Sequence, residues 1–332
     1  MPPFKVLVTD YAWPSLKIEQ KILKSVNAAL LLSKTDEEAE LLTLASKADA
    51  ILTCWAPISE ALVDSAKKAI IISRYGVGLD NIPVDYATKS GILVTNVPRY
   101  CTEEVSDHAM ALILACARNI VQHVNNTRQG QWDAKAVGRS ARLCNQTIGM
   151  IGCGRTARAL IPKALGFEMK IIAHTPRIVE GALAPFAKTT RKMKAMLNEA
   201  DYVSVHVPLT EETRGMVDKK IFKQMKSTAY LINTSRGAVV NEPDLIDALK
   251  TGQIAGAALD VLTQEPPDPD NPLLKMDNVI VTPHAAFYSE DSISELQTTA
   301  ATQVVQALSG QKPDNLVNPT VLDQPNVRLK AI

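Results

Sequence analysis

The sequence is short of the features that mark secreted, metal-binding and membrane-spanning proteins. Its 332 residues include only five cysteines, an odd number with no CxxC pair. This pattern argues against a disulfide framework and against a thiolate metal site. No stretch reaches the ~18 consecutive apolar residues of a spanning helix, and the N-terminus lacks the apolar core of a signal peptide. We expect a reduced cytoplasmic protein that holds no metal.

The sequence also lacks an excess of charge of either sign. Lys and Arg number 36 against 35 for Asp and Glu, which leaves a formal net charge of +1. No overall field therefore attracts nucleic acid or a membrane surface. Any anion that the protein binds has to be held by local charge, and we expect its partners to be small molecules.

What is present is a repeated alternation of short apolar runs and amphipathic stretches, which is typical of βα units. The length suggests two domains. In the first hundred residues the expected strands are Lys5–Thr9, Ala50–Cys54, Ile70–Ser73 and Ile92–Asn96, and the expected helices are Ser15–Val26, Glu37–Ala45 and Ser59–Lys67. This part predicts a small α/β domain.

A second series begins near Gln146 and predicts a parallel, doubly wound sheet. Its expected strands are Thr147–Ile151, Lys170–Ala173, Tyr202–Val205, Ala229–Asn233, Gly256–Asp260 and Val279–Thr282, and one more helix is expected at Ile293–Leu308. The fold class is therefore α/β, with two Rossmann-like doubly wound parallel-sheet domains and a cleft between them. We place a substrate-binding, flavodoxin-like domain at 1–100, completed by 289–332, and a nucleotide-binding Rossmann domain at 101–288.

An unusually apolar helix is expected at Glu103–Thr127, between the two series. Thr102 is the candidate N-cap, and acidic residues in the first turn suit the helix dipole. The helix is apolar around most of its circumference, so we expect it to pack against a second subunit in a homodimer. His108 and His123 lie in this segment and are interpreted as structural.

The strongest local motif is the glycine turn in Thr147–Ala157, where Gly152, Gly154 and Ala157 fit the pattern G-x-G-x-x-G/A. The first glycine allows a tight turn, the second lets the backbone approach a pyrophosphate, and a small third residue lets helix and strand pack closely. The following helix offers free N–H groups to phosphates. The motif predicts a dinucleotide site, and a purely structural turn is the alternative.

The end of the next strand bears on which dinucleotide is bound. An acidic residue is expected about 20 positions past the glycines, where it would bind the adenosine ribose, but Thr175 stands there with Arg177 two residues on. A hydroxyl and a guanidinium suit a 2′-phosphate. We therefore expect an NAD(P) cofactor, with NADP weakly favoured over NAD. The alternative is that Arg177 is a solvated loop residue.

Three segments stand at the ends of later strands, which is the ligand-binding edge of such a sheet. They are Leu231–Gly237, Ala258–Pro266 and Val281–Ala285. The residues of these three segments resemble motifs of the D-isomer-specific 2-hydroxyacid dehydrogenase family, and so do those of Tyr75–Ile82 and His206–Thr210. The resemblance covers nearly the whole chain. Thr9–Trp13 and Val97–Glu104 are most similar to its carboxy-terminal-binding-protein-like branch, and phosphoglycerate dehydrogenases are also relatives.

Chemistry gives three of these residues roles, and the resemblance implies the same roles. Hydride transfer to C2 of a 2-oxo acid needs a proton donor at the carbonyl oxygen and a clamp for the carboxylate. His284 is the candidate general acid–base, since histidine titrates near neutral pH. Glu265 can accept a hydrogen bond from its other ring nitrogen, and the forked guanidinium of Arg236 suits a carboxylate and a carbonyl oxygen together. The alternative for Glu265 is the start of a surface loop.

The resemblance further implies that the backbone N–H groups of Val77 and Gly78 bind the substrate carboxylate, and that Asp260 holds the nicotinamide carboxamide. Asp260 could instead be a helix or turn cap, and His206 could simply pack under the sheet edge. The full set of expected cofactor-binding residues is Gly152, Gly154, Arg155, Thr156, Thr175, Arg177, His206, Pro208, Thr213, Thr234 and Asp260.

The expected function is an NAD(P)-dependent D-2-hydroxyacid dehydrogenase, or 2-oxoacid reductase. Arg99 could bind a second anionic group on the substrate, or it could be a surface or hinge arginine. The alternative function is a nicotinamide-sensing interaction protein with little turnover, because the branch that the chain resembles includes such proteins. The intact set of Arg236, Glu265 and His284 favours the enzyme.

Overall fold

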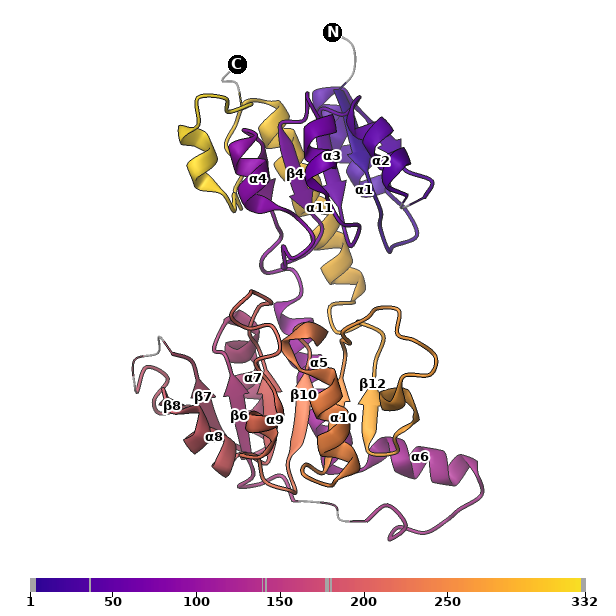
Figure 1. Ribbon diagram of the computed structural model, residues 1–332, viewed down its shortest axis with the longest axis vertical. Helices are drawn as coiled ribbons and strands as arrows, with labels where there is room; N and C mark the ends of the chain where they lie inside the picture. The colour runs from indigo at the N-terminus through magenta and orange to yellow at the C-terminus, as the bar shows by residue number, and fades with distance from the viewer. Residues whose placement is uncertain are drawn as a thin grey trace. The chain divides into compact units, whose positions relative to one another are not determined.

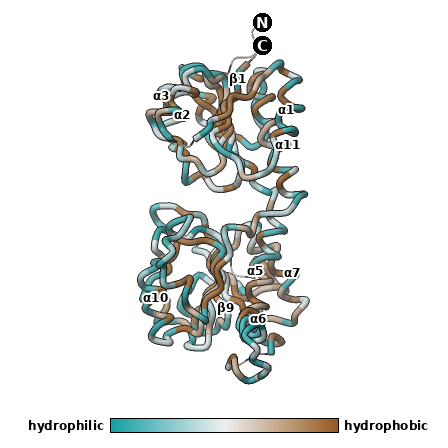
Figure 2. Tube along the Cα trace, turned by 90° about the vertical axis from the view of Figure 1, so that its right-hand side faces the viewer, coloured by the Kyte–Doolittle hydropathy of each residue, from teal (hydrophilic) through white to brown (hydrophobic). Residues whose placement is uncertain are grey.

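The chain divides into two compact units, one formed by Met1–Tyr100 with Ser289–Ile332 and the other by Cys101–Tyr288. The computed structural model describes residues 4–35, 37–138, 140, 142–176, 179 and 181–329. Each unit contains one parallel sheet with helices on both of its faces (Figure 1). Hydrophobic segments run through the middle of each unit, where the strands lie (Figure 2).

The first unit is built on a five-stranded sheet with the order β2-β1-β3-β4-β5. The strands are β1 (Phe4–Val8), β2 (Ala28–Leu32), β3 (Ala50–Thr53), β4 (Ile71–Arg74) and β5 (Leu93–Thr95). Its helices are α1 (Lys17–Leu23), α2 (Glu38–Ala45), α3 (Glu60–Ser65), α4 (Val84–Lys89) and α11 (Glu290–Leu308). Apolar side chains of α2, α3 and α4 form one buried cluster with the sheet, and α11 packs on β3, β4 and α1.

The second unit is built on a seven-stranded sheet with the order β12-β11-β10-β9-β6-β7-β8. The strands are β6 (Thr147–Ile151), β7 (Lys170–His174), β8 (Lys188–Thr190), β9 (Tyr202–Val205), β10 (Tyr230–Asn233), β11 (Gly256–Leu259) and β12 (Val279–Val281). The helices are α5 (Thr102–Ala117), α6 (Ile120–Arg128), α7 (Arg155–Gly166), α8 (Met193–Glu199), α9 (Lys219–Phe222) and α10 (Glu242–Lys250). Residues of α5 and α7 cover one face of the sheet, and residues of α8, α9 and α10 cover the other.

The strand order of the second unit defines where a ligand can bind. The chain goes outward from β6 to β8 and then returns to β9 on the other side of β6. Open parallel sheets bind their ligands beyond the carboxyl ends of the strands at this kind of switch point. The glycine turn follows β6, and the three segments singled out in the sequence follow β10, β11 and β12.

The predicted α/β fold with two parallel sheets is confirmed, but several elements differ from the sequence-based expectations. The prediction of one continuous helix at Glu103–Thr127 was wrong. α5 ends at Ala117 and α6 begins at Ile120, because Asn119 between them adopts the left-handed conformation with a φ of 49°. Thr102 is the first helical residue and not the N-cap. Sequence analysis also missed β2, α4 and β8, which are short elements of three to six residues.

Candidate active site

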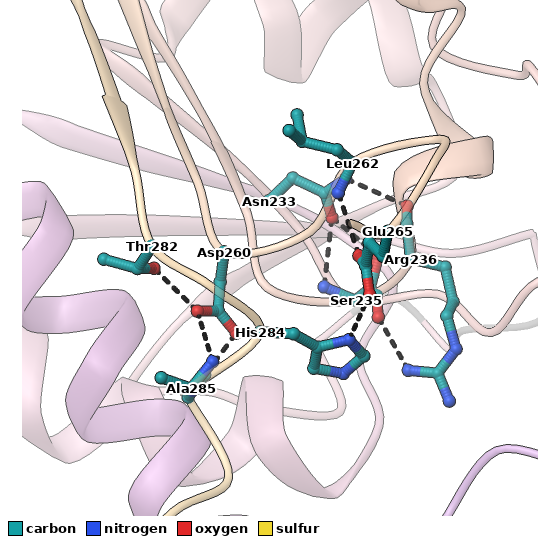
Figure 3. A network of polar contacts seen from close by, with 10 residues as sticks. Asn233, Ser235, Arg236, Asp260, Leu262, Glu265, Thr282, His284 and Ala285 are labelled. Carbon is teal, nitrogen blue, oxygen red and sulfur yellow. Dashed lines mark hydrogen bonds and ion pairs between the residues drawn. The ribbon is translucent and has the colours of Figure 1, made fainter. Parts of the chain in front are cut away.

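The loops that follow β10, β11 and β12 bring the three predicted catalytic residues together. The Nδ1 atom of His284 lies 2.6 Å from Oε2 of Glu265 (Figure 3). The other oxygen of that carboxylate accepts a hydrogen bond of 3.0 Å from the backbone N–H of Leu262. The carboxylate is therefore held in place by its own loop while it contacts the imidazole ring.

The charge state of Glu265 follows from its surroundings. Burial of the side chain raises its pKa, but the hydrogen bond to His284, the charge of His284 and the charge of Arg236 together hold the pKa of Glu265 below its usual value. The carboxylate is ionised at neutral pH and can only accept hydrogen bonds. Nδ1 of His284 must therefore carry a proton, and Nε2 is the ring nitrogen left to exchange a proton with a ligand.

The Arg236 loop is shaped by the asparagine at the end of β10. The side-chain oxygen of Asn233 accepts hydrogen bonds from the backbone N–H and the hydroxyl of Ser235, at 3.0 and 2.8 Å. Its side-chain NH₂ donates to the backbone oxygen of Arg236 at 2.9 Å. Nη1 of Arg236 donates to the backbone oxygen of Ser235 at 2.8 Å. These contacts fix the direction in which the guanidinium leaves the strand end.

Gly237 permits the close approach of this loop to the Glu265 loop. A Cβ atom at position 237 would lie only 1.9 Å from the backbone carbon of Leu262. Since Leu262 also donates its N–H to Glu265, the missing side chain at Gly237 is what lets the arginine loop and the glutamate loop pack backbone to backbone.

Asp260 lies beneath the turn that carries His284. It is 1 % exposed, and its carboxylate accepts hydrogen bonds from the hydroxyl of Thr282 at 2.6 Å and from the backbone N–H groups of Ala285 and Ala286 at 2.9 Å each (Figure 3). These contacts position the turn. The contact with a nicotinamide carboxamide that the resemblance implies for Asp260 stays a prediction.

The glycine turn has the geometry that the motif requires. Gly152 has a φ of 97°, and a Cβ atom there would lie 2.5 Å from the backbone oxygen of His206, so only glycine fits. Among the described residues, no atom lies within 4 Å of the Cβ position of Gly154. Gly154 is also the N-cap of α7. Because glycine has no side chain, it makes no side-chain hydrogen bond to the first N–H groups of the helix. The turn is therefore open where a pyrophosphate would approach these N–H groups.

The remaining predicted cofactor residues fall along the same edge of the sheet. Arg155 and Thr156 begin α7, and Thr175 follows β7 and is half-buried. The hydroxyl of Thr213 donates to the backbone oxygen of Pro208 at 2.6 Å, which closes the loop after β9. Arg177 lies outside the described residues.

Two further residues at this edge, His206 and Thr234, bear on whether a dinucleotide fits. Nε2 of His206 lies 2.9 Å from the hydroxyl of Ser204, and burial lowers the pKa of His206 to about 4. The ring is therefore neutral at pH 7. The hydroxyl of Thr234 is buried and has no hydrogen-bond partner in the part of the chain that the structure describes, and a buried polar atom of this kind calls for a ligand or water. With the open turn at Gly154, these groups fit a dinucleotide.

The predicted substrate-carboxylate residues belong to the first unit. Val77 and Gly78 follow β4 in a loop that begins at Gly76, whose φ is 144°. The backbone oxygen of Val77 accepts a hydrogen bond of 2.7 Å from the side chain of Asn96, and the side chain of Val77 is exposed. Arg99 is also exposed.

Several residues that shape the site were missed by sequence analysis. Asn233 and Gly237 lie within three residues of Arg236 in the sequence. This closeness to a predicted site residue was the only signal that could have pointed to them. The contacts of Thr282 and of the Leu262 N–H had no such signal, because a backbone donor leaves no mark in a sequence. Within the described ranges, no group of three His, Cys, Asp or Glu side chains is arranged to hold a metal ion, and no helix is long and apolar enough to cross a membrane.

Comparison with known proteins gives a consistent result. A family model described as "D-isomer specific 2-hydroxyacid dehydrogenase, NAD binding domain" matches residues 110–286. A glyoxylate reductase of Korarchaeum cryptofilum is 40 % identical over 80 % of this chain and 81 % of its own length. A D-3-phosphoglycerate dehydrogenase of Methanocaldococcus jannaschii is 36 % identical over 95 % of this chain, which spans 59 % of that longer relative.

Solved structures agree with these matches. An NADPH-dependent glyoxylate/hydroxypyruvate reductase of Sinorhizobium meliloti, in complex with NADP and malonate, superposes with a TM-score of 0.86 at 27 % identity and covers 100 % of both chains. A D-lactate dehydrogenase of Aquifex aeolicus, in complex with NAD and lactic acid, has a TM-score of 0.86 at 28 % identity and covers 94 % of this chain and 98 % of its own. Because the family model matches more than half of the chain, the protein belongs to the D-isomer specific 2-hydroxyacid dehydrogenase family.

Proposed function

We propose that the protein is an NAD(P)-dependent reductase of small 2-oxo acids, which it converts reversibly to D-2-hydroxy acids. The observation that carries this proposal is the contact between Nδ1 of His284 and Oε2 of Glu265, which are 2.6 Å apart at the end of the sheet. The loop that carries Glu265 also packs against the Arg236 loop. Family membership supports an NAD(P)-dependent D-2-hydroxyacid dehydrogenase, and the relatives named as glyoxylate reductases support a small 2-oxo acid as substrate.

Each of the three residues has a distinct task in this reaction. The reduced nicotinamide, when bound, supplies the hydride that reaches C2. His284 gives a proton from Nε2 to the substrate oxygen as the carbonyl double bond becomes a single bond, and it takes that proton back in the reverse direction. Glu265 keeps the second proton on Nδ1 and so keeps Nε2 directed to the substrate. Arg236 binds the substrate carboxylate and polarises the carbonyl oxygen.

The proposed binding of the substrate carboxylate and the preference for NADP follow from the family resemblance and from the chemistry of single residues. Val77 and Gly78 donate backbone N–H groups to the substrate carboxylate. The dinucleotide lies along the glycine turn, and NADP is weakly favoured over NAD because Thr175 stands where an acidic residue would repel a 2′-phosphate. The NADPH-dependent relative of Sinorhizobium meliloti supports this preference, whereas the Aquifex aeolicus relative in complex with NAD supports the other cofactor. The cytoplasmic location stays a prediction.

The test is a panel of 2-oxo acids (glyoxylate, hydroxypyruvate, pyruvate and 2-oxoglutarate) assayed with NADPH and with NADH. We expect turnover of at least one acid, the D-isomer as product, and a higher kcat/KM with NADPH. The His284→Ala variant should lose about 10²- to 10⁴-fold in kcat, the range for a general acid, with an unchanged dissociation constant for the cofactor. An active His284→Ala enzyme would overturn the assignment.

We also propose that the protein is a homodimer. Three large apolar side chains support this proposal: Ile120 and Val124 of α6 are 50 % and 41 % exposed, and Trp132 beyond the helix is 91 % exposed. Ile120 and Val124 lie four residues apart and so share one face of α6, and exposed apolar side chains on one face are typical of subunit contacts. Sedimentation of the protein as a monomer at micromolar concentration would contradict this proposal.

A further inference from the structure

The turn that carries His284 depends on one buried carboxylate. His284 has a φ of 50°, in the left-handed region that non-glycine residues rarely occupy. Such a conformation costs on the order of 1–3 kcal/mol and persists only where its surroundings enforce it. Asp260 enforces it from both sides: its backbone oxygen accepts the N–H of His284 at 2.8 Å, and its carboxylate accepts the N–H groups of Ala285 and Ala286.

A second histidine contacts this carboxylate from the helix behind the sheet. His108 lies in α5, far from the turn in sequence. Its Nε2 atom is 3.0 Å from the hydroxyl oxygen of Thr282 and 3.5 Å from Oδ1 of Asp260. The side chain of His108 is 24 % exposed, so most of the ring is enclosed by the surrounding protein.

The direction of the hydrogen bonds can be derived from the number of protons. The hydroxyl of Thr282 has a single proton and lies 2.6 Å from Oδ1 of Asp260. Both oxygens of Asp260 also accept backbone N–H groups, from Ala285 and Ala286, so the carboxylate is the acceptor and the hydroxyl of Thr282 is the donor. The hydroxyl oxygen can then only accept from His108, and Nε2 of His108 must carry a proton. The chain of donors runs from His108 through Thr282 to Asp260.

We infer that His108 is a positioning residue for the reaction: through Thr282 and Asp260 it holds the turn of His284 in its left-handed conformation. The ring touches no reacting atom. It supplies a donor that fixes the hydroxyl of Thr282, so that the hydroxyl and the two backbone N–H groups meet one carboxylate in a fixed orientation. This inference rests on the function proposed above for His284 and gives a histidine of α5 a role in the reaction.

The first experiment needs no substrate and uses the whole chain without cofactor. Amide hydrogen exchange at Ala285 and Ala286 is compared for the native protein, His108→Ala, His108→Gln and His123→Ala. Gln places a side-chain NH₂ near the position of Nε2, and His123 in α6 is a matched control. We expect exchange to be about fivefold faster in His108→Ala, the factor that one hydrogen bond contributes, and to return toward the native rate in His108→Gln.

The second experiment measures kinetics on the best substrate of the panel. His108→Ala should lower kcat by about five- to tenfold while KM for the cofactor stays unchanged, and His108→Gln should recover most of the loss. A general loss of stability would instead change exchange throughout α5 and would not be rescued by Gln. Unchanged exchange at Ala285 and Ala286 in His108→Ala overturns the inference, even if no 2-oxo acid is reduced, so its failure is separate from failure of the proposed function.

Discussion

Each unit of the chain contains a glutamate that other side chains contact, and the two carboxyl groups behave in opposite ways. Glu265 in the second unit contacts His284, and the pairing holds its pKa below the usual value. Glu19 in the first unit is fully buried and accepts hydrogen bonds from the hydroxyl of Tyr75 at 3.0 Å and from the side-chain NH₂ of Gln297 at 2.8 Å. Its burial outweighs these contacts and raises its pKa.

The difference shows how each unit uses a carboxyl group that other side chains contact. A carboxylate beside a cationic partner stays ionised and can orient a proton donor. A carboxyl group surrounded by neutral donors serves instead to tie elements together, since Glu19, Tyr75 and Gln297 come from α1, the end of β4 and α11. Hydrogen bonds alone do not decide the charge state; the balance of burial and nearby charge does.

The sharpest test of this comparison is to neutralise both glutamates. Glu265→Gln should lower kcat about 10²-fold or more, because an amide cannot hold the charged form of His284 and can present a donor to Nδ1. Glu19→Gln should leave kcat within about twofold of the native value, since the amide oxygen still accepts from Tyr75. Steady-state kinetics of both variants measure the two changes in kcat. Equal losses of kcat in the two variants would show that the two carboxyl groups do not differ in their roles.

A second test compares close backbone contacts in the two units. Gly237→Ala places a Cβ atom 1.9 Å from Leu262 and so pushes the arginine loop away from the glutamate loop. Gly91→Ala in the first unit places one 2.1 Å from the backbone oxygen of Asn326. Both should destabilise the protein by about 1–3 kcal/mol, but only Gly237→Ala should lower kcat, by about tenfold or more.

Thermal unfolding and steady-state assays at a temperature where both variants are folded separate these effects. If Gly91→Ala lost as much kcat as Gly237→Ala, the close packing at Gly237 would have no special connection to the active site.

The smallest expected effect concerns the dependence of the protein's stability on pH. The folded pKa of Glu265 lies below its usual value of 4.5, so its stabilising contribution is present above pH 4.5 and is lost as the pH falls through the folded value. The folded pKa of Glu19 lies above 4.5, so stability falls as the pH rises from 4.5 to that value. Glu19→Gln should therefore flatten the Tm profile above pH 4.5, and Glu265→Gln should flatten it below.

Calorimetry over both ranges, with the buffer matched for ionic strength, measures the two slopes. A Glu19→Gln profile that parallels the native one above pH 4.5 would mean that Glu19 does not change its protonation on unfolding in this range.

Much of the site could be predicted because parallel strands end at one edge of a sheet. That rule alone places Arg236, Glu265 and His284 near each other once β10, β11 and β12 are recognised, and the glycine turn marks β6 in the same way. The contacts that set their geometry were not predictable. The packing of Gly237 on Leu262 depends on a backbone approach, and His108 seemed structural because no sequence pattern connects a helix to a turn more than 150 residues away.

The missed strands are both edge strands, but they were missed for different reasons. β2 (Ala28–Leu32) is wholly apolar, but it consists of alanine and leucine, which favour helices rather than strands. β8 has only three residues, one lysine and two threonines, and so lacks the apolar run of a central strand. The break between α5 and α6 depends on the left-handed Asn119, which a hydrophobic pattern does not reveal.

The interruption of the first unit by the second has a consequence for biosynthesis. Residues 1–100 leave the ribosome first, but α11, which covers β3 and β4 and accepts the hydroxyl of Ser73 at the backbone oxygen of Ala300, is translated almost two hundred residues later. Nascent chains therefore carry an uncovered apolar sheet face while the contiguous second unit completes its core. We expect this early segment to be the part of the chain that is most prone to aggregation during synthesis.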